Sequence, residues 1–264
     1  MSEESGPVQP RRNFFGLLWG MIRHPRTTLE CVDQSGGRTW VIMALLAAVS
    51  AVFLVVSVAP ISARIAQEAM QTQLQSQFGV SPGGDDAEMQ AQISQFATNP
   101  LLTIVAPSLT GVIGILIGWL VWAGALHLIS VIVGGDSHFG GMWRGVVWSY
   151  LPIALRNGLQ SIYVLATGEL IANQGLSGLA AVDQTVSELI ASPPSPGRLA
   201  LQALLAQIDL FNIWNLFLLV ITVMTIARLS SRKAIGITLG VWGALMVVRM
   251  LVAIVPTLFA SGFS

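Results

Sequence analysis

The chain of 264 residues has no net charge at neutral pH, and 53% of its residues are hydrophobic while 10% are charged. Soluble domains carry about 25% charged residues, so a soluble fold of this length could not cover its apolar surface with polar side chains. The composition therefore excludes an ordinary soluble protein and predicts one that lipid covers in part. Because positive charge is not in excess, we expect no nucleic-acid partner.

Residues 1–12 are polar and contain proline, which predicts a disordered N-terminal tail. In the next segment, 13–39, the aromatic stretch Phe14–Ile22 lies between arginines but is too short to span a bilayer, which takes about 20 residues. Such a stretch is typical of an interfacial helix that lies on an anionic cytoplasmic leaflet. Thr27 and Glu30 then fit a capping box at the start of a further helix.

Five long apolar runs follow and predict an all-α polytopic membrane protein with five transmembrane helices. Each run is long enough to cross a hydrocarbon core of about 30 Å, and none has the two-residue alternation of a barrel strand. Together they predict a membrane domain over residues 40–255. In chain order the predicted spans are Trp40–Val58, Ser108–Val133, Gly145–Thr167, Leu210–Ile226 and Ile235–Val255.

Two insertions rich in Gln and acidic residues, 61–100 and 168–209, separate these spans on one side. Apolar residues recur every four or five positions from Ile61 to Phe78, which predicts an amphipathic helix that continues from the first span. A Ser-Pro-Gly-Gly break follows, and Asp85 begins a second helix, so the first insertion predicts a helical hairpin.

The second insertion predicts two short helices, the later of which, Leu199–Ile208, leads straight into the fourth span. Residues 256–264 form a C-terminal tail on the same side of the membrane as the insertions.

The distribution of Lys and Arg predicts the orientation. Nine of the 13 basic residues fall in the segments 1–39, 134–144 and 227–234, and each long insertion contains one. Basic loops remain in the cytoplasm, so we expect a multi-pass protein of the cytoplasmic (inner) membrane. Its N-terminus is then cytoplasmic, and its C-terminus and hairpin are extracytoplasmic.

Three short motifs resemble the Yip1 domain family. Val133–Phe139 is a Gly-rich loop, and it leads into a span that carries Tyr150-Leu151-Pro152, like the Tyr-x-Pro of that family. Asp209–Trp214 resembles the Asp-x-Phe-x-x-Trp motif at the start of the fourth span of the family, and Pro25–Thr28 resembles its Pro-x-x-Thr segment. The resemblance covers about residues 14–255.

The resemblance implies a membrane protein but does not assign it one activity. Eukaryotic relatives are Golgi and endoplasmic-reticulum proteins that bind Rab GTPases in vesicle traffic, whereas prokaryotic members have no settled activity. The acidic, aromatic N-terminal motif of the eukaryotic relatives is absent here, which argues against a Rab-type GTPase as partner.

The sequence carries no motif of known catalytic or metal chemistry. There is no Gly-Lys-Ser/Thr phosphate loop, no Gly-x-Ser-x-Gly and no His-Glu-x-x-His, and the three histidines are scattered. Cys31 is the only cysteine, so neither a disulfide nor a thiolate metal site can form within the chain. We therefore expect a protein that is not an enzyme and has no cofactor.

Polar residues inside the predicted spans give the candidate site. A charged side chain in the bilayer is costly, so it should face the helix bundle and find a partner there. Three interpretations stay open: a network that locks helix packing, a pocket for an anionic group such as a lipid phosphate, and a conduction path. The residues are Arg156, Asn157, Asp209, Asn212, Asn215 and Arg249.

Gly111, Gly114 and Gly118 give the second span a small-residue face, which predicts close helix packing within the chain or in a homo-oligomer. The leading hypothesis is a membrane scaffold or accessory subunit that binds protein partners, membrane lipids or both. The alternative is a transporter of lipid or small solutes that uses the intramembrane polar cluster.

Overall fold

The computed structural model describes residues 13–34, 39–78, 99–171, 173–179 and 195–261, and every regular element in them is helical. The all-α prediction is thus confirmed for this part of the chain. In chain order the elements are α1 (Phe14–Arg23), α2 (Pro25–Gln34), α3 (Thr39–Phe78), the π-helical turn η1 (Leu101–Val105), α5 (Ala106–Ile132), α6 (Phe139–Ser149), α7 (Leu151–Thr167), the 3-10 turn η2 (Ser177–Leu179), α9 (Pro196–Leu205), α10 (Leu210–Ile226) and α11 (Ser231–Ser261).

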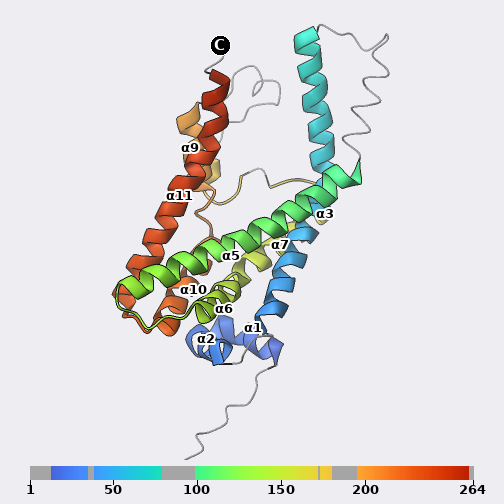
Figure 1. The fold of residues 1–264 in the computed structure, drawn as a ribbon. Helices are drawn as coiled ribbons and strands as arrows, with labels where there is room; N and C mark the ends of the chain where they lie inside the picture. Colours follow the sequence, from blue (N-terminus) through green and yellow to red (C-terminus); the bar gives the residue numbers. More distant parts are fainter. Residues whose placement is uncertain (1–12, 35–38, 79–98, 172, 180–194, 262–264) are drawn as a thin grey trace, which may run out of the picture.

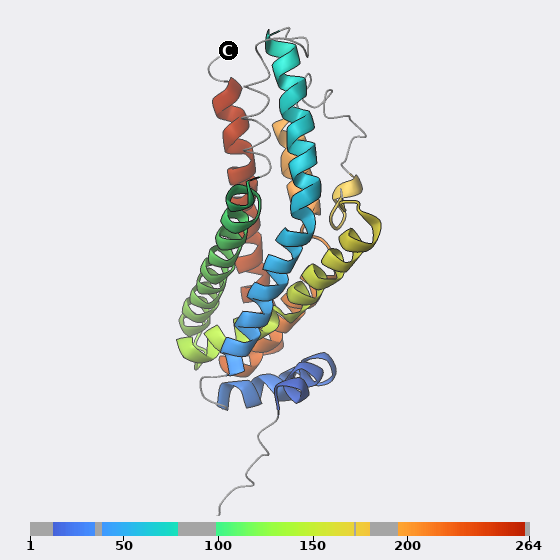
Figure 2. The same ribbon diagram turned by 90° about the vertical axis from the view of Figure 1, so that its right-hand side faces the viewer.

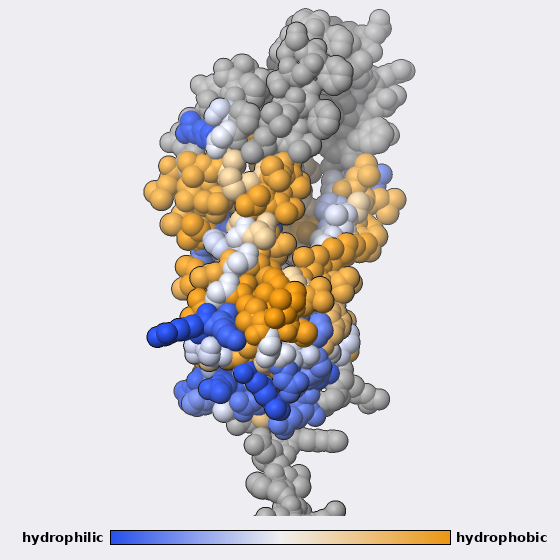
Figure 3. All heavy atoms as spheres, turned by 60° about the vertical axis from the view of Figure 1, so that its left-hand side comes forward, coloured by the Kyte–Doolittle hydropathy of each residue, from blue (hydrophilic) through white to orange (hydrophobic). Residues whose placement is uncertain are grey.

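Three helical stretches in the described residues are long and apolar enough to cross a membrane, namely Thr39–Ala69, Leu101–Ile132 and Ser231–Val252. A fourth forms if α9 and α10 count as one span, although they are bent by 67° at the break between them. In the most apolar part of the three long stretches only 22%, 17% and 22% of the residues are buried inside the protein. Figure 3 shows the resulting apolar belt above a hydrophilic band, as expected for a surface that lipid covers.

The predicted third span is not a single helix. It is divided at Tyr150 into α6 and α7, because Pro152 has no N–H and its ring clashes with the carbonyl group four residues earlier. The N–H groups of Ile153 and Ala154 both bond to the carbonyl of Tyr150, so a new helix begins there. Neither half alone is long enough to cross a membrane, so five spans remain a prediction.

Two other boundaries differ from those predicted. The first span is predicted over Trp40–Val58, but the stretch of α3 that is apolar enough to cross a membrane extends through Pro60 to Ala69. The predicted continuation of this helix to Phe78 is confirmed, because α3 ends there. The chain does not pass straight from α9 into α10, because Ala206–Asp209 form a sharp link between them. The second helix of the predicted hairpin, which begins at Asp85, lies outside the described residues.

The helices α1 and α2 lie across one end of the bundle, at the bottom of Figures 1 and 2. Met21 and Leu29 are fully buried there, and the ring of Phe14 lies 5.7 Å from that of Trp148 in α6. The predicted capping box is wrong, because α2 begins at Pro25. The hydroxyl group of Thr27 donates to the carbonyl of His24 instead.

The three segments predicted to be cytoplasmic meet at this end. Arg144 of α6 donates to the Asp33 carboxylate of α2 at 2.7 Å, and His138 lies 3.2 Å from the same carboxylate. The Asp136 N–H donates to the carbonyl of Ala227 at 3.1 Å, which joins the Gly-rich loop to the α10–α11 turn. The loop therefore connects the N-terminal helices to the span helices.

Candidate functional site

A cavity of about 340 Å³ lies among α5, α6, α7, α10 and α11. Trp119 and Trp122 of α5 and Trp242 of α11 give it an aromatic wall. The only charged residues that line it are two arginines, from α7 and α11. Its polar and charged wall is formed by Tyr150, Arg156, Gln207, Asn212, Asn215 and Arg249.

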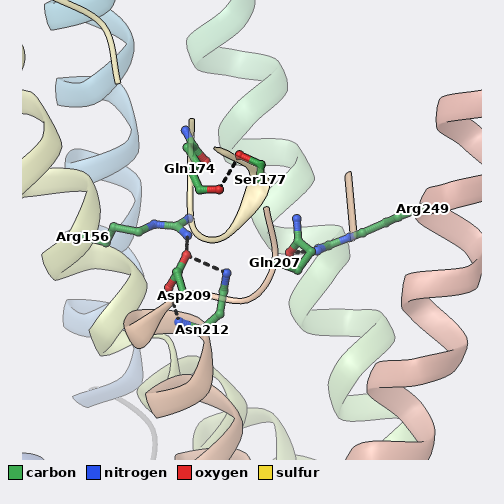
Figure 4. Close-up of polar contacts among 7 residues, drawn as sticks. All are labelled: Arg156, Gln174, Ser177, Gln207, Asp209, Asn212 and Arg249. Carbon is green, nitrogen blue, oxygen red and sulfur yellow. Dashed lines mark hydrogen bonds and ion pairs between the residues drawn. The ribbon is translucent and has the colours of Figure 1, made fainter. Parts of the chain in front are cut away.

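Arg156 is neutralised by Asp209. The guanidinium group donates to Oδ2 of Asp209 at 2.7 Å, and the two side chains are only 20% and 12% exposed. Asp209 is also the N-cap of α10, since Oδ1 accepts the backbone N–H of Asn212 at 2.7 Å. The Asn212 amide donates to Oδ2 at 3.0 Å. One carboxylate thus joins α7 to the start of α10 and accepts three hydrogen bonds (Figure 4).

Arg249 reaches the same link from the opposite side, as Figure 4 shows. Its guanidinium group donates to Oε1 of Gln207 at 2.5 Å, and Gln207 is neutral. No ion pair joins Arg249 to a carboxylate among the described residues. Both guanidinium groups line the same cavity as Tyr150. The site therefore carries about one positive charge that no acidic side chain of the described residues balances.

Asn215 has a structural task in the wall of the cavity. Its amide donates to the carbonyl of Ser149 at 2.7 Å, at the break between α6 and α7. The helical partner of this carbonyl would be the N–H of Ile153, which bonds to Tyr150 instead. Asn215 therefore satisfies a backbone group that the helix break releases.

Asn157 does not join the site. It is buried, at 7% exposure, but it does not line the cavity. Its backbone carbonyl accepts the Ser161 hydroxyl group within α7. Of the six candidate residues, Arg156, Asn212, Asn215 and Arg249 line the cavity, and Asp209 binds Arg156 and Asn212.

The loop 173–179 holds the link in place, and no sequence motif predicts this contact. The N–H of Leu176 donates to the carbonyl of Leu205 at 3.1 Å. Gly175 has a φ of 57°, and a Cβ there would lie 2.7 Å from the carbonyl oxygen of Ile208. Only glycine fits this position, because the backbone is left-handed and the approach is close. Figure 4 shows Gln174 and Ser177 beside the Arg156–Asp209 pair.

Two buried donors in the wall lack partners. Trp119 is 3% exposed, and its indole Nε1 has no hydrogen-bond partner among the described residues. The Nε of Arg156 is likewise buried without a partner in this part of the chain. A buried donor without a partner costs about 1–3 kcal/mol, and both atoms are covered by protein atoms, so a ligand in the cavity would not reach them directly.

The glycines of α5 have free space beside them among the described residues. A Cβ added at Gly111, Gly114 or Gly118 would meet no described heavy atom within 4 Å. Close helix packing through this face, within the chain or between two copies, stays a prediction. Gly114 and Gly118 also line the cavity.

A second cavity, of about 480 Å³, lies at the opposite end, beside α2 and the α10–α11 turn. It is also polar, but each of its arginines has an acidic neighbour. Arg26 lies 3.7 Å from Glu30, and Arg228 lies 3.7 Å from Asp136. This balance distinguishes it from the cavity beside Arg249. The described residues contain no group of three His, Cys, Asp or Glu that could hold a metal ion.

Comparison with known families identifies the chain. The family model of the Yip1 domain matches residues 19–252, which is nearly the whole sequence. The chain therefore belongs to the Yip1 domain family, and the resemblance carried by the three motifs is confirmed. Comparison with curated proteins and with solved structures finds no match to the chain.

Proposed function

We propose that this Yip1-family protein is a non-enzymatic membrane scaffold or accessory protein that binds an anionic group, such as a lipid phosphate, in the cavity beside Arg249. The observation that carries the proposal is the unbalanced charge of Arg249 in a wall that also presents the Arg156 guanidinium. A charge at membrane depth is costly unless it is paired, and a bound anion would pair it.

The Arg156–Asp209 pair serves packing in this proposal. Its carboxylate already accepts three hydrogen bonds, so it has little capacity for an additional ligand. Arg249, in contrast, is exposed and donates to a neutral amide. We favour binding over transport because the Arg156–Asp209 ion pair joins α7 to α10 beside the cavity.

We place the N-terminal end of the protein in the cytoplasm and the protein in the cytoplasmic membrane. The meeting of the three basic segments at one end supports this orientation. The face of α1 that holds Phe15 and Trp19, which are 80% and 56% exposed, supports an interfacial helix. The Arg23 guanidinium lies 4.6 Å from the centre of the Trp19 ring, where it could also reach lipid phosphate.

Native mass spectrometry of the full chain with added phosphatidylglycerol tests the proposal. Arg249→Gln removes a charge-assisted contact and should weaken binding by about ten- to a hundredfold. Arg228→Gln is the matched control, because Arg228 is exposed outside the cavity and should leave binding unchanged. If Arg249→Gln binds this lipid as tightly as the unaltered protein does, the proposed site is wrong.

The scaffold role has its own test. Affinity purification in mild detergent should recover partner proteins in stoichiometric amounts. Repeated recovery of the chain alone, as a monomer, would remove the support for a scaffold while leaving the lipid site open to the mass-spectrometric test.

A further inference from the structure

The cavity is bordered by two span helices, α5 and α11. Gly114, Gly118 and Trp122 of its lining belong to α5, while Trp242 and Arg249 belong to α11. In Figure 1, these helices come together near the end of α5 and diverge toward the C-terminal end of α11. The charged wall at Arg249 therefore lies on the part of α11 that diverges from α5.

Glycines on α5 leave free space along its side of the gap between the two helices. Gly114 and Gly118 have no side chains, and a Cβ at either position would meet no described atom within 4 Å. Space for a side chain thus exists beside the backbone, and it adjoins the cavity rather than a neighbouring helix. Apolar side chains such as Ile113 and Ile117 of α5 are 46% and 56% exposed, so the surroundings of the gap suit hydrocarbon.

We propose that the gap between α5 and α11 is a lateral portal through which an anionic phospholipid places its headgroup in the cavity while its acyl chains remain in the bilayer. The proposal rests on the proposed function and names the ligand class and the route. It predicts that one acyl chain lies along Gly114 and Gly118, between Trp122 and Trp242.

Size and charge favour this ligand. A cavity of about 340 Å³ can hold a headgroup but not two acyl chains, so the chains of a bound lipid must leave through an opening. Arg249 supplies a positive charge for the phosphate, and no acidic side chain of the described residues lines the cavity. A headgroup with net negative charge balances this charge, whereas a zwitterionic one would bring its own cation to Arg249.

Leucine substitutions at the glycines test the portal directly. Gly114→Leu and Gly118→Leu should each weaken binding of long-chain phosphatidylglycerol about tenfold, equivalent to excluding about two methylene groups of a chain. Gly111→Leu is the matched control, because Gly111 has the same free space but does not line the cavity. Thermal unfolding of each purified variant establishes that it is folded.

Binding of sn-glycerol 3-phosphate, which has the headgroup chemistry but no chain, is measured in parallel. We expect it to bind far more weakly than phosphatidylglycerol and to be unaffected by the leucine variants. If it binds as tightly as the lipid, the ligand is a free phosphate and the portal is wrong. If Arg249→Gln abolishes lipid binding but both leucine variants bind normally, the headgroup site stands and the portal is wrong.

If Arg249→Gln, Gly114→Leu and Gly118→Leu all bind the lipid as the unaltered protein does, both proposals are wrong. A change in oligomeric state in Gly114→Leu and Gly118→Leu, with lipid binding intact, would assign the glycine face to contact between two copies instead.

A phosphatidylglycerol with a photoactivatable acyl chain tests the portal without variants. Its cross-links in the unaltered protein should map to α5 and α11, and cross-links confined to the outer face of α3 would overturn the portal.

Discussion

Removing the charge of Asp209 should destabilise the protein far more than its position at a helix end suggests. Asp209→Asn retains a good N-cap for α10, because asparagine caps helices as well as aspartate does. It leaves Arg156, which is 20% exposed, without a carboxylate. Loss of one partner from a buried ion pair costs about 3–5 kcal/mol, and partial exposure reduces this to about 2–3 kcal/mol here.

Thermal unfolding in detergent measures the effect. A change of 1 kcal/mol moves the midpoint of a chain of this size by about 2–4 °C, so Asp209→Asn should lower it by about 4–12 °C. Asp209→Ala also removes the cap, which adds about 1 kcal/mol to the loss. Combining Asp209→Asn with Arg156→Gln should recover most of the stability, because no unpaired charge is then left in the bundle.

The double variant decides between charge pairing and simple loss of contacts. If it is less stable than Asp209→Asn alone, the unpaired Arg156 is not the source of the cost. A midpoint of Asp209→Asn within 1 °C of the unaltered protein would refute the reasoning altogether, since the argument requires a cost of about 4 °C or more.

Two further substitutions probe how the helices around the site are held. Gly145→Ala should cost about 1–3 kcal/mol in unfolding free energy, because the added methyl group would collide with Cγ2 of Thr222 on α10. Adding Thr222→Ser removes that methyl group and should restore the unfolding midpoint, and no recovery would contradict the contact. Asn215→Leu should cost about 1–3 kcal/mol because the carbonyl of Ser149 loses its donor. Ile213→Leu, at an exposed position of the same helix, is its control and should leave the midpoint unchanged.

Composition and periodicity predict the helices well because both report directly on burial in lipid. The limits of the second predicted span lie within one turn of those of α5. The fifth predicted span lies inside α11. Pro152, two residues after Tyr150, favours a break in the third span, although α3 continues through Pro60 and a proline alone therefore does not decide the matter. A hydropathy window does not detect such a break, because the residues on both sides of it are equally apolar.

The polar cluster is predicted from the free-energy cost of a charged side chain in the bilayer, and not from a motif that indicates which residues touch. Arg156 and Asp209 were grouped because a charge at membrane depth needs a partner, and the structure brings them to 2.7 Å. Gln207 and Tyr150 are not among the predicted site residues, because Gln207 lies in the second insertion and Tyr150 is named only as part of the Tyr-x-Pro motif. The hydrogen bond from Asn215 to the carbonyl of Ser149 is not predicted either, because it depends on the break between α6 and α7, and the predicted third span is continuous.

The two arginines of the spans show why spacing along the sequence could not assign their roles. Both interrupt the pattern of basic loops, and counting from the outer ends places them at similar depths. Their partners are nevertheless set by the sharp link between α9 and α10, which presents Gln207 to α11 and Asp209 to α7. The bend thus neutralises one arginine and leaves the other beside an open cavity, and this difference makes Arg249 the residue that distinguishes a binding site from a packing network.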